Sequence, residues 1–137
     1  MINISKIYHW NEIKHKVKNK NYIIYVELIK DVVYSHNEIV ESYIFGSFAR
    51  ELLAQSINPE YRHPKYGRHF RKESDIDVFV LCEEKYTDEF KGEGWCCEEL
   101  MILLENEPPE IDGHEISWDT AGKWMVTNIP FKIQIKP

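Results

Sequence analysis

The spacing of apolar residues along the chain predicts helices that alternate with short strands. Residues 22–35 carry apolar side chains at intervals of three and four, which is the period of one helix face. We expect this face to pack on a sheet, and its members are Ile24, Leu28, Ile29, Val32 and Val33. Shorter helices are predicted over residues 9–18, 48–56 and 96–105.

Short apolar or alternating runs predict the strands. The first covers residues 43–45, the second 75–82, and three more lie in the tail, over 115–118, 124–127 and 131–135. Turn residues at 120–122 favour a hairpin between the first two tail strands, ahead of the final strand. Helices packed on a mixed sheet make an α/β fold, or α+β in a stricter classification.

Length and composition indicate one ordinary globular domain over residues 1–137, with N-terminal helices over 1–36. No apolar run approaches the roughly 20 residues of a membrane-spanning helix, and no signal-peptide pattern is present. Three cysteines (Cys82, Cys96 and Cys97) suit neither a disulfide framework nor a zinc site. We therefore expect a reducing, cytoplasmic setting and no membrane partner.

Two segments carry the candidate chemistry, and the first is a turn between a strand and a helix. Gly46-Ser47 follows an apolar strand and opens the helix over 48–56. Backbone N–H groups at a helix N-terminus can hold a phosphate, and the helix dipole also favours the anion. The plainer interpretation is that Ser47 only caps the helix.

The second segment places two acids at the start of a strand. Asp75 and Asp77 are two residues apart, so their side chains lie on one face of the strand. Asp77 stands within an apolar run, where an unpaired carboxylate is costly to bury. A pair of divalent ions held by such carboxylates is a standard device for phosphoryl transfer.

Together, these segments resemble the nucleotidyltransferase fold, the superfamily of DNA polymerase beta, the tRNA CCA-adding enzymes and the minimal bacterial nucleotidyltransferases. The family pattern is an apolar residue, Gly-Ser, a variable stretch and Asp-x-Asp in a strand. Phe45-Gly46-Ser47 and Asp75-Ile76-Asp77 fill this pattern, and Ala49-Arg50 is also similar to the minimal enzymes. The resemblance covers about residues 40–137 and is strongest over 43–81.

The resemblance implies a metal-dependent transfer of NMP from an NTP to an acceptor hydroxyl, with release of pyrophosphate. Gly46 and Ser47 would hold the phosphates, and Asp75 and Asp77 would bind two Mg²⁺ ions, or Mn²⁺ in their place. The acceptor would be a protein, an RNA or a small molecule. Minimal members of the family often act beside a small helical toxin, so such a partner, or a homodimer, is expected.

The family usually carries a third carboxylate on a strand beside the Asp-x-Asp strand. In members with a C-terminal hairpin, its position corresponds here to Gln134, whose amide cannot take a proton. The alternatives are Glu115 on the preceding strand, which shares a face with Ser117 and Asp119, and Asp112 just before it. If Gln134 fills the position, the chain is instead a catalytically degenerate fold that serves as a binding or regulatory module, such as an antitoxin.

A basic inserted loop over residues 57–73 separates the two motifs. It holds five Lys and Arg residues, with Tyr61, Tyr66 and Phe70 interleaved, against a formal net charge of −6 for the whole chain. Cations with flat aromatic rings can bind phosphates and stack on bases, so Arg68 and Arg71 are predicted nucleotide ligands. Arg50, one turn into the helix after Ser47, is a further phosphate candidate, with a surface salt bridge as the alternative.

Overall fold

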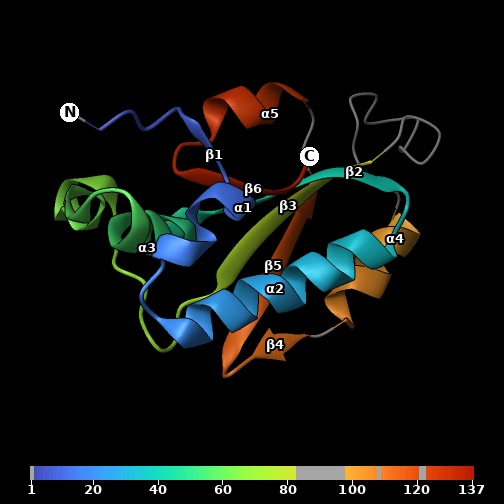
Figure 1. Cartoon of the computed structure of the whole chain (residues 1–137). Helices are drawn as coiled ribbons and strands as arrows, with labels where there is room; N and C mark the ends of the chain where they lie inside the picture. The colour runs from blue at the N-terminus through green and yellow to red at the C-terminus, as the bar shows by residue number, and fades with distance from the viewer. Residues whose placement is uncertain (1, 83–97, 108, 121–122) are drawn as a thin grey trace.

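The fold is mixed α/β, with helices packed on one six-stranded sheet (Figure 1). The computed structural model describes residues 2–82, 98–107, 109–120 and 123–137. The strands are β1 (Ile7–His9), β2 (Ile39–Phe45), β3 (Ile76–Cys82), β4 (Glu110–Ile111), β5 (His114–Thr120) and β6 (Lys132–Lys136). Their order across the sheet is β1-β6-β2-β3-β5-β4.

The helices differ from the sequence prediction mainly in the tail. They are α1 (Trp10–Ile13), α2 (Lys20–Ser35), α3 (Gly46–Ser56), α4 (Glu98–Glu105) and α5 (Lys123–Asn128), with short 3-10 helices η1 (Lys14–Lys16), η2 (Pro59–Arg62) and η3 (Pro64–Tyr66). The predicted strand over 124–127 is therefore wrong, because that segment is α5. The predicted hairpin between 115–118 and 124–127 is therefore wrong, and β5 instead forms a short hairpin with β4 and pairs parallel with β3.

The central strand β3 lies between β2 and β5. It runs antiparallel to β2, with Phe45 opposite Asp77. It runs parallel to β5, with Asp77 opposite Ser117 and Phe79 opposite Asp119. This register decides which polar side chains of the two neighbouring strands stand beside the Asp-x-Asp motif.

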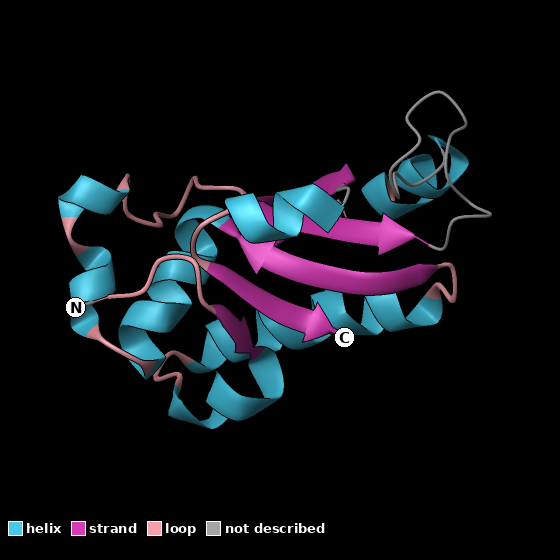
Figure 2. Cartoon of the chain, turned by 90° about the horizontal axis from the view of Figure 1, so that it is seen from above, coloured by secondary structure: helices cyan, strands magenta, loops and turns pink. Residues whose placement is uncertain are grey.

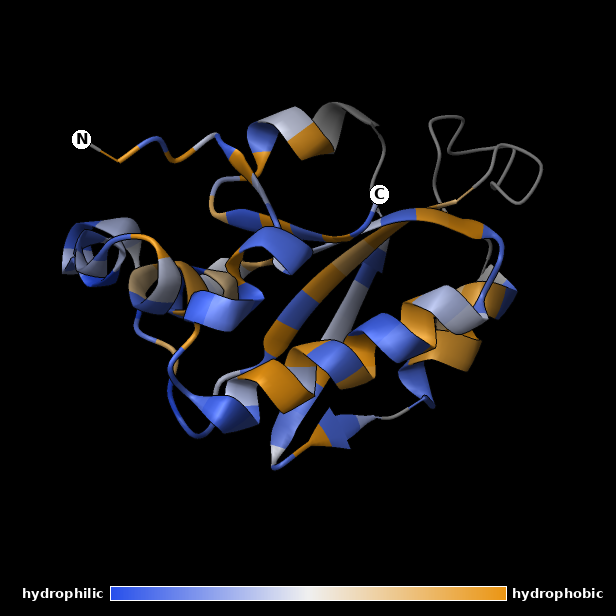
Figure 3. Cartoon of the chain, in the orientation of Figure 1, coloured by the Kyte–Doolittle hydropathy of each residue, from blue (hydrophilic) through white to orange (hydrophobic). Residues whose placement is uncertain are grey.

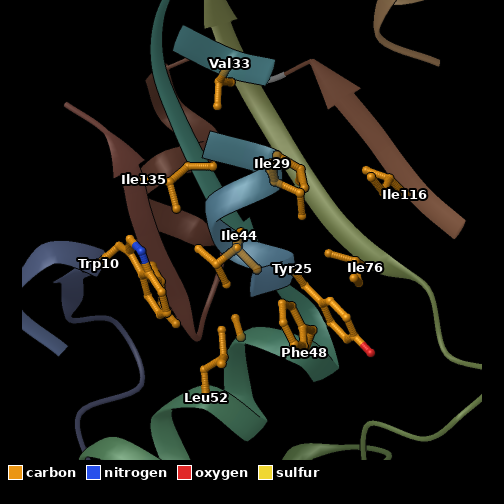
Figure 4. Close-up of a cluster of buried hydrophobic side chains, with 14 of the residues drawn as sticks. Trp10, Tyr25, Ile29, Val33, Ile44, Phe48, Leu52, Ile76, Ile116 and Ile135 are labelled. Carbon is orange, nitrogen blue, oxygen red and sulfur yellow. The ribbon is translucent and has the colours of Figure 1, made fainter. Parts of the chain in front are cut away.

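One face of the sheet carries the main hydrophobic core (Figure 4). The helix α2 contributes Tyr25, Val26, Ile29 and Val33, all buried against the strands. The helical period of residues 22–35 is confirmed, but the expected face is partly wrong, since Ile24 is 54% and Leu28 43% exposed. The face of α2 that packs is centred on Tyr25, Val26, Ile29 and Val33, so it is rotated from the predicted face and shares only Ile29 and Val33 with it.

The opposite face of the sheet has a smaller apolar cluster made by Tyr43, Phe79, Leu81 and Val126, the last of these from α5. Figures 1 and 2 show α5 on the side of the sheet away from α2. Side chains alternate between faces along a strand, so Asp77 and Phe79 both belong to this second face. The candidate site is built at its edge.

Among the described residues, no helix is long and apolar enough to cross a bilayer. We expected the cysteines to be free thiols, and this is wrong for Cys82, which is disulfide-bonded at the end of β3. Cys96 and Cys97 lie outside the described residues. The cysteines therefore do not support a reducing compartment.

Candidate functional site

The two acids of the Asp-x-Asp motif lie at the beginning of β3. Asp75 immediately precedes the strand and Asp77 is its second residue, so both carboxylates belong to one face. In Figure 3, β3 is hydrophobic along most of its length, with a hydrophilic band near its start. Asp77 is half-buried. The strand thus holds a carboxylate within an otherwise apolar environment, as the sequence predicts.

The turn from β2 into α3 brings backbone against Asp77. Gly46 begins α3 with φ at +75°, a region that side chains with a Cβ rarely adopt. A Cβ at this position would collide with Oδ2 of Asp77. The Gly-Ser and Asp-x-Asp motifs are therefore in direct contact. The N-cap of α3 is Phe45, so the interpretation of Ser47 as a simple cap is wrong.

A cavity of about 490 Å³ adjoins both motifs. Its lining consists of Ser47, Arg68, His69, Arg71, Glu73, Ser74, Asp75 and Asp77. The structure thus brings together a hydroxyl at a helix N-terminus, two acids and two arginines that the sequence nominated separately. Two other nominated residues, Arg50 and Glu115, are not part of this lining.

A third carboxylate, Asp119 of β5, lies near Asp77. It pairs with Phe79 and therefore shares the face of Asp77, one pair further along the strands. Burial raises the pKa of Asp77 to about 6, and the charges of Asp119 and Asp75 add to this effect. Burial also raises the pKa of Asp119. Mutual repulsion between carboxylates is what a bound cation would relieve.

The sequence did not nominate Asp119, although it placed this residue on one face with Glu115. The alternation of polar and apolar residues in β5 assigns both acids to the same face, but it leaves open which of them stands beside Asp77. The register between β3 and β5 pairs Asp77 with Ser117, midway between the two acids, and it is the charge of Asp119 that acts on Asp77. Pairing partners of this kind cannot be read from a period of two.

Gln134 is not beside the Asp-x-Asp strand. Its strand, β6, pairs with β1 and β2, so β2 separates it from β3. Gln134 is buried, and its Nε2 donates a hydrogen bond of 3.1 Å to the hydroxyl of Tyr43. The assignment of Gln134 to the third acid position is therefore wrong, because β5 rather than β6 is the second neighbour of β3.

Neither Glu115 nor Asp112 borders the cavity that Asp77 lines. Glu115 is exposed and lies opposite Glu110 of β4. Asp112 lies in the turn before β5 and accepts a hydrogen bond of 2.6 Å from the hydroxyl of Tyr25, on the side of the main core. This bond raises the pKa of Tyr25 to about 12. Asp112 thus fixes a tyrosine of α2.

Arg50 is 3% exposed, so neither a surface salt bridge nor an open phosphate ligand describes it. Its Nη2 donates to the carbonyl oxygen of Arg68, and its Nη1 has no partner among the described residues. Burial lowers the pKa of this guanidinium. Arg50 therefore supports the basic loop from beneath, at the point where Arg68 enters the cavity.

The basic loop is anchored to the rest of the protein by its own aromatic residues. Tyr61 is 1% exposed, and its hydroxyl lies 2.8 Å from that of Tyr8. Phe70 stacks on His114 with ring centroids 4.7 Å apart. Tyr61 is therefore not available to stack on a base, Tyr66 and Phe70 are partly buried against the core, and the arginines beside them border the cavity.

A second cavity, of about 400 Å³, meets the first at Asp75. It is lined by Asp75, Glu105, Pro109, Glu110, Glu115, Ile116, Ser117 and Trp118. Asp75 is therefore the border between a cavity that carries arginines and one whose ionisable lining residues are all acids.

The carboxylates of Asp75, Asp77 and Asp119 have the donor chemistry of a site for Mg²⁺ or Mn²⁺, since hard cations prefer oxygen ligands. In the part of the chain that the structure describes, no three such side chains converge closely enough to hold an ion. The donor set fits the metal in chemistry and charge, while its three carboxylates are spread too widely to meet at one ion in this conformation. Comparisons with protein-family models, with curated proteins and with solved structures give no match to this chain.

Proposed function

We propose that this protein is a metal-dependent nucleotidyltransferase, which transfers an NMP from an NTP to an acceptor hydroxyl and releases pyrophosphate. The observation that carries the proposal is the 490 Å³ cavity in which Ser47 of the helix turn meets both Asp75 and Asp77. A phosphate-binding turn and a pair of carboxylates in one cavity are the parts that phosphoryl transfer needs.

The triphosphate would lie between the N-terminus of α3 and the basic loop. Ser47 offers a hydroxyl and the backbone N–H groups of the first helical turn, which carry no intrahelical bond. Arg68 and Arg71 border the same cavity and would bind phosphate oxygens through charge-assisted hydrogen bonds. Gly46 would keep the backbone close to the carboxylate of Asp77.

Asp75, Asp77 and Asp119 would hold the metal, Mg²⁺ or Mn²⁺, on the exposed edge of this sheet face. When bound, two such ions neutralise charge on the triphosphate and bring the attacking and leaving oxygens into line. An acceptor hydroxyl oxygen would attack the α-phosphorus while the bond to the pyrophosphate oxygen breaks. The carboxylate of Asp119 is a suitable group to take the hydroxyl proton, because burial raises its pKa.

The degenerate binding module remains the second candidate. The displacement of Gln134 from the site removes the argument that first suggested it. The observation in its favour is that the described acids do not converge on one point that could hold an ion. A module of this kind would bind a partner protein, with neither binding nor transfer of a nucleotide.

Calorimetric titration of the four NTPs in the presence of Mg²⁺ separates these functions, because it requires no knowledge of the acceptor. We expect micromolar binding of at least one NTP by the native protein and its loss in Asp77→Asn. Asp31→Asn, on the exposed side of α2, is the matched control for the change in charge and should bind like the native protein.

Failure of the native protein to bind any NTP would favour the binding module. Unchanged affinity in Asp77→Asn would remove the metal assignment while leaving a nucleotide site. Where binding is found, release of pyrophosphate from the bound NTP in the presence of candidate hydroxyl acceptors tests the transfer itself. We place this reaction in the cytoplasm, which supplies NTPs and Mg²⁺, and the disulfide of Cys82 would then be an exception to the usual reduced state of cytoplasmic thiols.

A further inference from the structure

His114, the first residue of β5, is a buried histidine next to the candidate site. It is 6% exposed and belongs to neither cavity. Its contacts reach the two segments that build the site, although β5 lies about forty positions further along the chain. A buried polar ring with specific partners on both segments needs a physical reason.

The first contact fixes the residue before Asp75. Nδ1 of His114 lies 2.7 Å from the carbonyl oxygen of Ser74. Because a carbonyl oxygen only accepts, Nδ1 carries the hydrogen and donates it. The peptide plane that contains this carbonyl also contains the N–H of Asp75, so the bond constrains the backbone at the point where the carboxylate begins.

The same carbonyl belongs to a short turn that ends the basic loop. The backbone N–H of Ser74 donates to the carbonyl of Arg71 at 3.1 Å, and the N–H of Arg71 donates to Oγ of Ser74 at 2.8 Å. By holding Ser74, the imidazole of His114 also holds the turn that places Arg71 in the cavity.

The second contact is made by the face of the imidazole ring. It stacks on Phe70 with centroids 4.7 Å apart and planes at 29°, and the ring of Tyr25 lies 5.8 Å away. Phe70 stands between His69 and Arg71, and both of these residues border the first cavity. His114 therefore contacts Ser74, which precedes Asp75, through Nδ1, and it contacts Phe70 of the basic loop through the face of its ring.

We propose that His114 is a positioning residue of the nucleotide site, which sets Asp75 against the arginines of the basic loop through its Nδ1–H bond to Ser74. This inference rests on the proposed function for its consequence in binding. Its geometric part, the constraint on Ser74 and Asp75, does not depend on a nucleotide.

Two substitutions separate the two contacts. His114→Asn places an amide nitrogen at the position of Nδ1, three bonds from Cα, and so keeps the donor while losing the ring. His114→Phe keeps a ring that can stack on Phe70 but has no donor. Thermal unfolding of both variants identifies the temperature range in which each is folded, and the comparison is made within that range.

The binding readout is the Mg²⁺ concentration that half-saturates NTP binding, measured by calorimetry. We expect His114→Phe to need about tenfold more Mg²⁺, the typical effect of losing an outer partner that orients a metal ligand. His114→Asn should stay within about threefold of the native value, since the charge-neutral donor is retained. A loss of stability alone would not move this concentration in a folded protein.

The second readout uses no ligand and follows the exchange of the Ser74 amide hydrogen by NMR. We expect exchange to be faster in His114→Phe and close to native in His114→Asn. Equal exchange and equal Mg²⁺ dependence in native protein and His114→Phe would overturn the positioning role. If the native protein binds no NTP, the proposed function fails, and the exchange comparison still decides whether His114 positions Ser74.

Discussion

Asp119 of β5 and Asp77 of β3 share one face of the sheet, and the charge of Asp119 helps to raise the pKa of Asp77 to about 6. Burial is the larger cause, and Asp75 adds a smaller electrostatic effect. The folded protein thus keeps an acid at an energetic disadvantage when it is ionised. Such a disadvantage is typical of sites whose missing partner is a cation.

The first prediction concerns the stability of Asp77→Asn as a function of pH, without metal. The folded protein binds the Asp77 proton more tightly than the unfolded chain, whose pKa is near 3.8, so the free energy of unfolding falls as pH rises from 3.8 to about 6. Above this range, Asp77→Asn should be more stable than the native protein by about 1–3 kcal/mol. The difference should disappear below about pH 4.

Urea unfolding in the presence of a chelator, at a series of pH values, measures this difference. A stabilisation that does not change with pH would mean that Asp77 has an ordinary pKa. Addition of Mg²⁺ should reverse the order of the two proteins near neutral pH, because an ion that binds only the folded state raises its stability.

The second prediction distinguishes the two acids of β5. Asp119→Asn and Glu115→Gln each remove one negative charge from the same face of the same strand. We expect Asp119→Asn to weaken Mg²⁺-dependent NTP binding by about tenfold or more, since Asp119 acts on Asp77 electrostatically. Glu115→Gln should change it by less than about twofold, because the charge of Glu115, unlike that of Asp119, is not among the causes of the raised pKa of Asp77.

Calorimetric titration of both variants with the NTP that the native protein binds measures the difference. The reverse order of effects would identify Glu115 as the third ligand. Equal and small effects would restrict the site to Asp75 and Asp77.

The local parts of the site could be predicted from the sequence, because each motif is contiguous. Gly46-Ser47 predicts a turn before a helix, and the spacing of Asp75 and Asp77 predicts two acids on one strand face. The cavity confirms that these groups lie together. What a contiguous motif cannot give is the identity of the neighbouring strand, and this is why Gln134 was considered in place of Asp119.

The segment over 124–127 is predicted as a strand because local preference was the only guide. Its composition is rich in residues that favour strands, but a local preference of this kind is weak beside tertiary packing. In the structure, Val126 of α5 closes the small cluster around Phe79. The face of α2 is a second example, since helical spacing gave the period of the helix but not the rotation at which Tyr25 meets the sheet.

The third prediction tests the basic loop. Arg68 and Arg71 border the cavity, whereas Lys65 and Lys72 do not, so the two pairs offer the same change in charge at different places. Arg68→Ala with Arg71→Ala should weaken NTP binding by about tenfold to a hundredfold, the range expected for two charge-assisted hydrogen bonds to phosphate. Lys65→Ala with Lys72→Ala should have a small effect that disappears in salt.

Titration of both double variants with NTP at low and high salt distinguishes direct contacts with the phosphates from long-range electrostatic attraction. If the lysine pair matters as much as the arginine pair, the loop acts only through its net charge. If neither pair matters, the loop is a spacer between α3 and β3.

The fourth prediction compares two of the three described glycines that have positive φ, one beside the candidate site and one in open space. Gly46 has φ at +75° and no room for a Cβ beside Asp77, whereas Gly113 has φ at +83° and nothing within 4 Å of the added atom. Gly113→Ala should therefore lose about 1–2 kcal/mol of stability, from backbone strain alone. Gly46→Ala should lose the same amount of stability and roughly 1–3 kcal/mol more, because the carboxylate of Asp77 or the turn must move.

Chemical unfolding of the two variants measures the difference in stability, and calorimetry measures its effect on the site. Gly46→Ala should lose Mg²⁺-dependent NTP binding, and Gly113→Ala should retain it, since only the first substitution displaces Asp77. Equal losses of stability would mean that the turn relaxes at no cost. In that case, retained binding in Gly46→Ala would show that the close approach of the two motifs is not what holds the nucleotide.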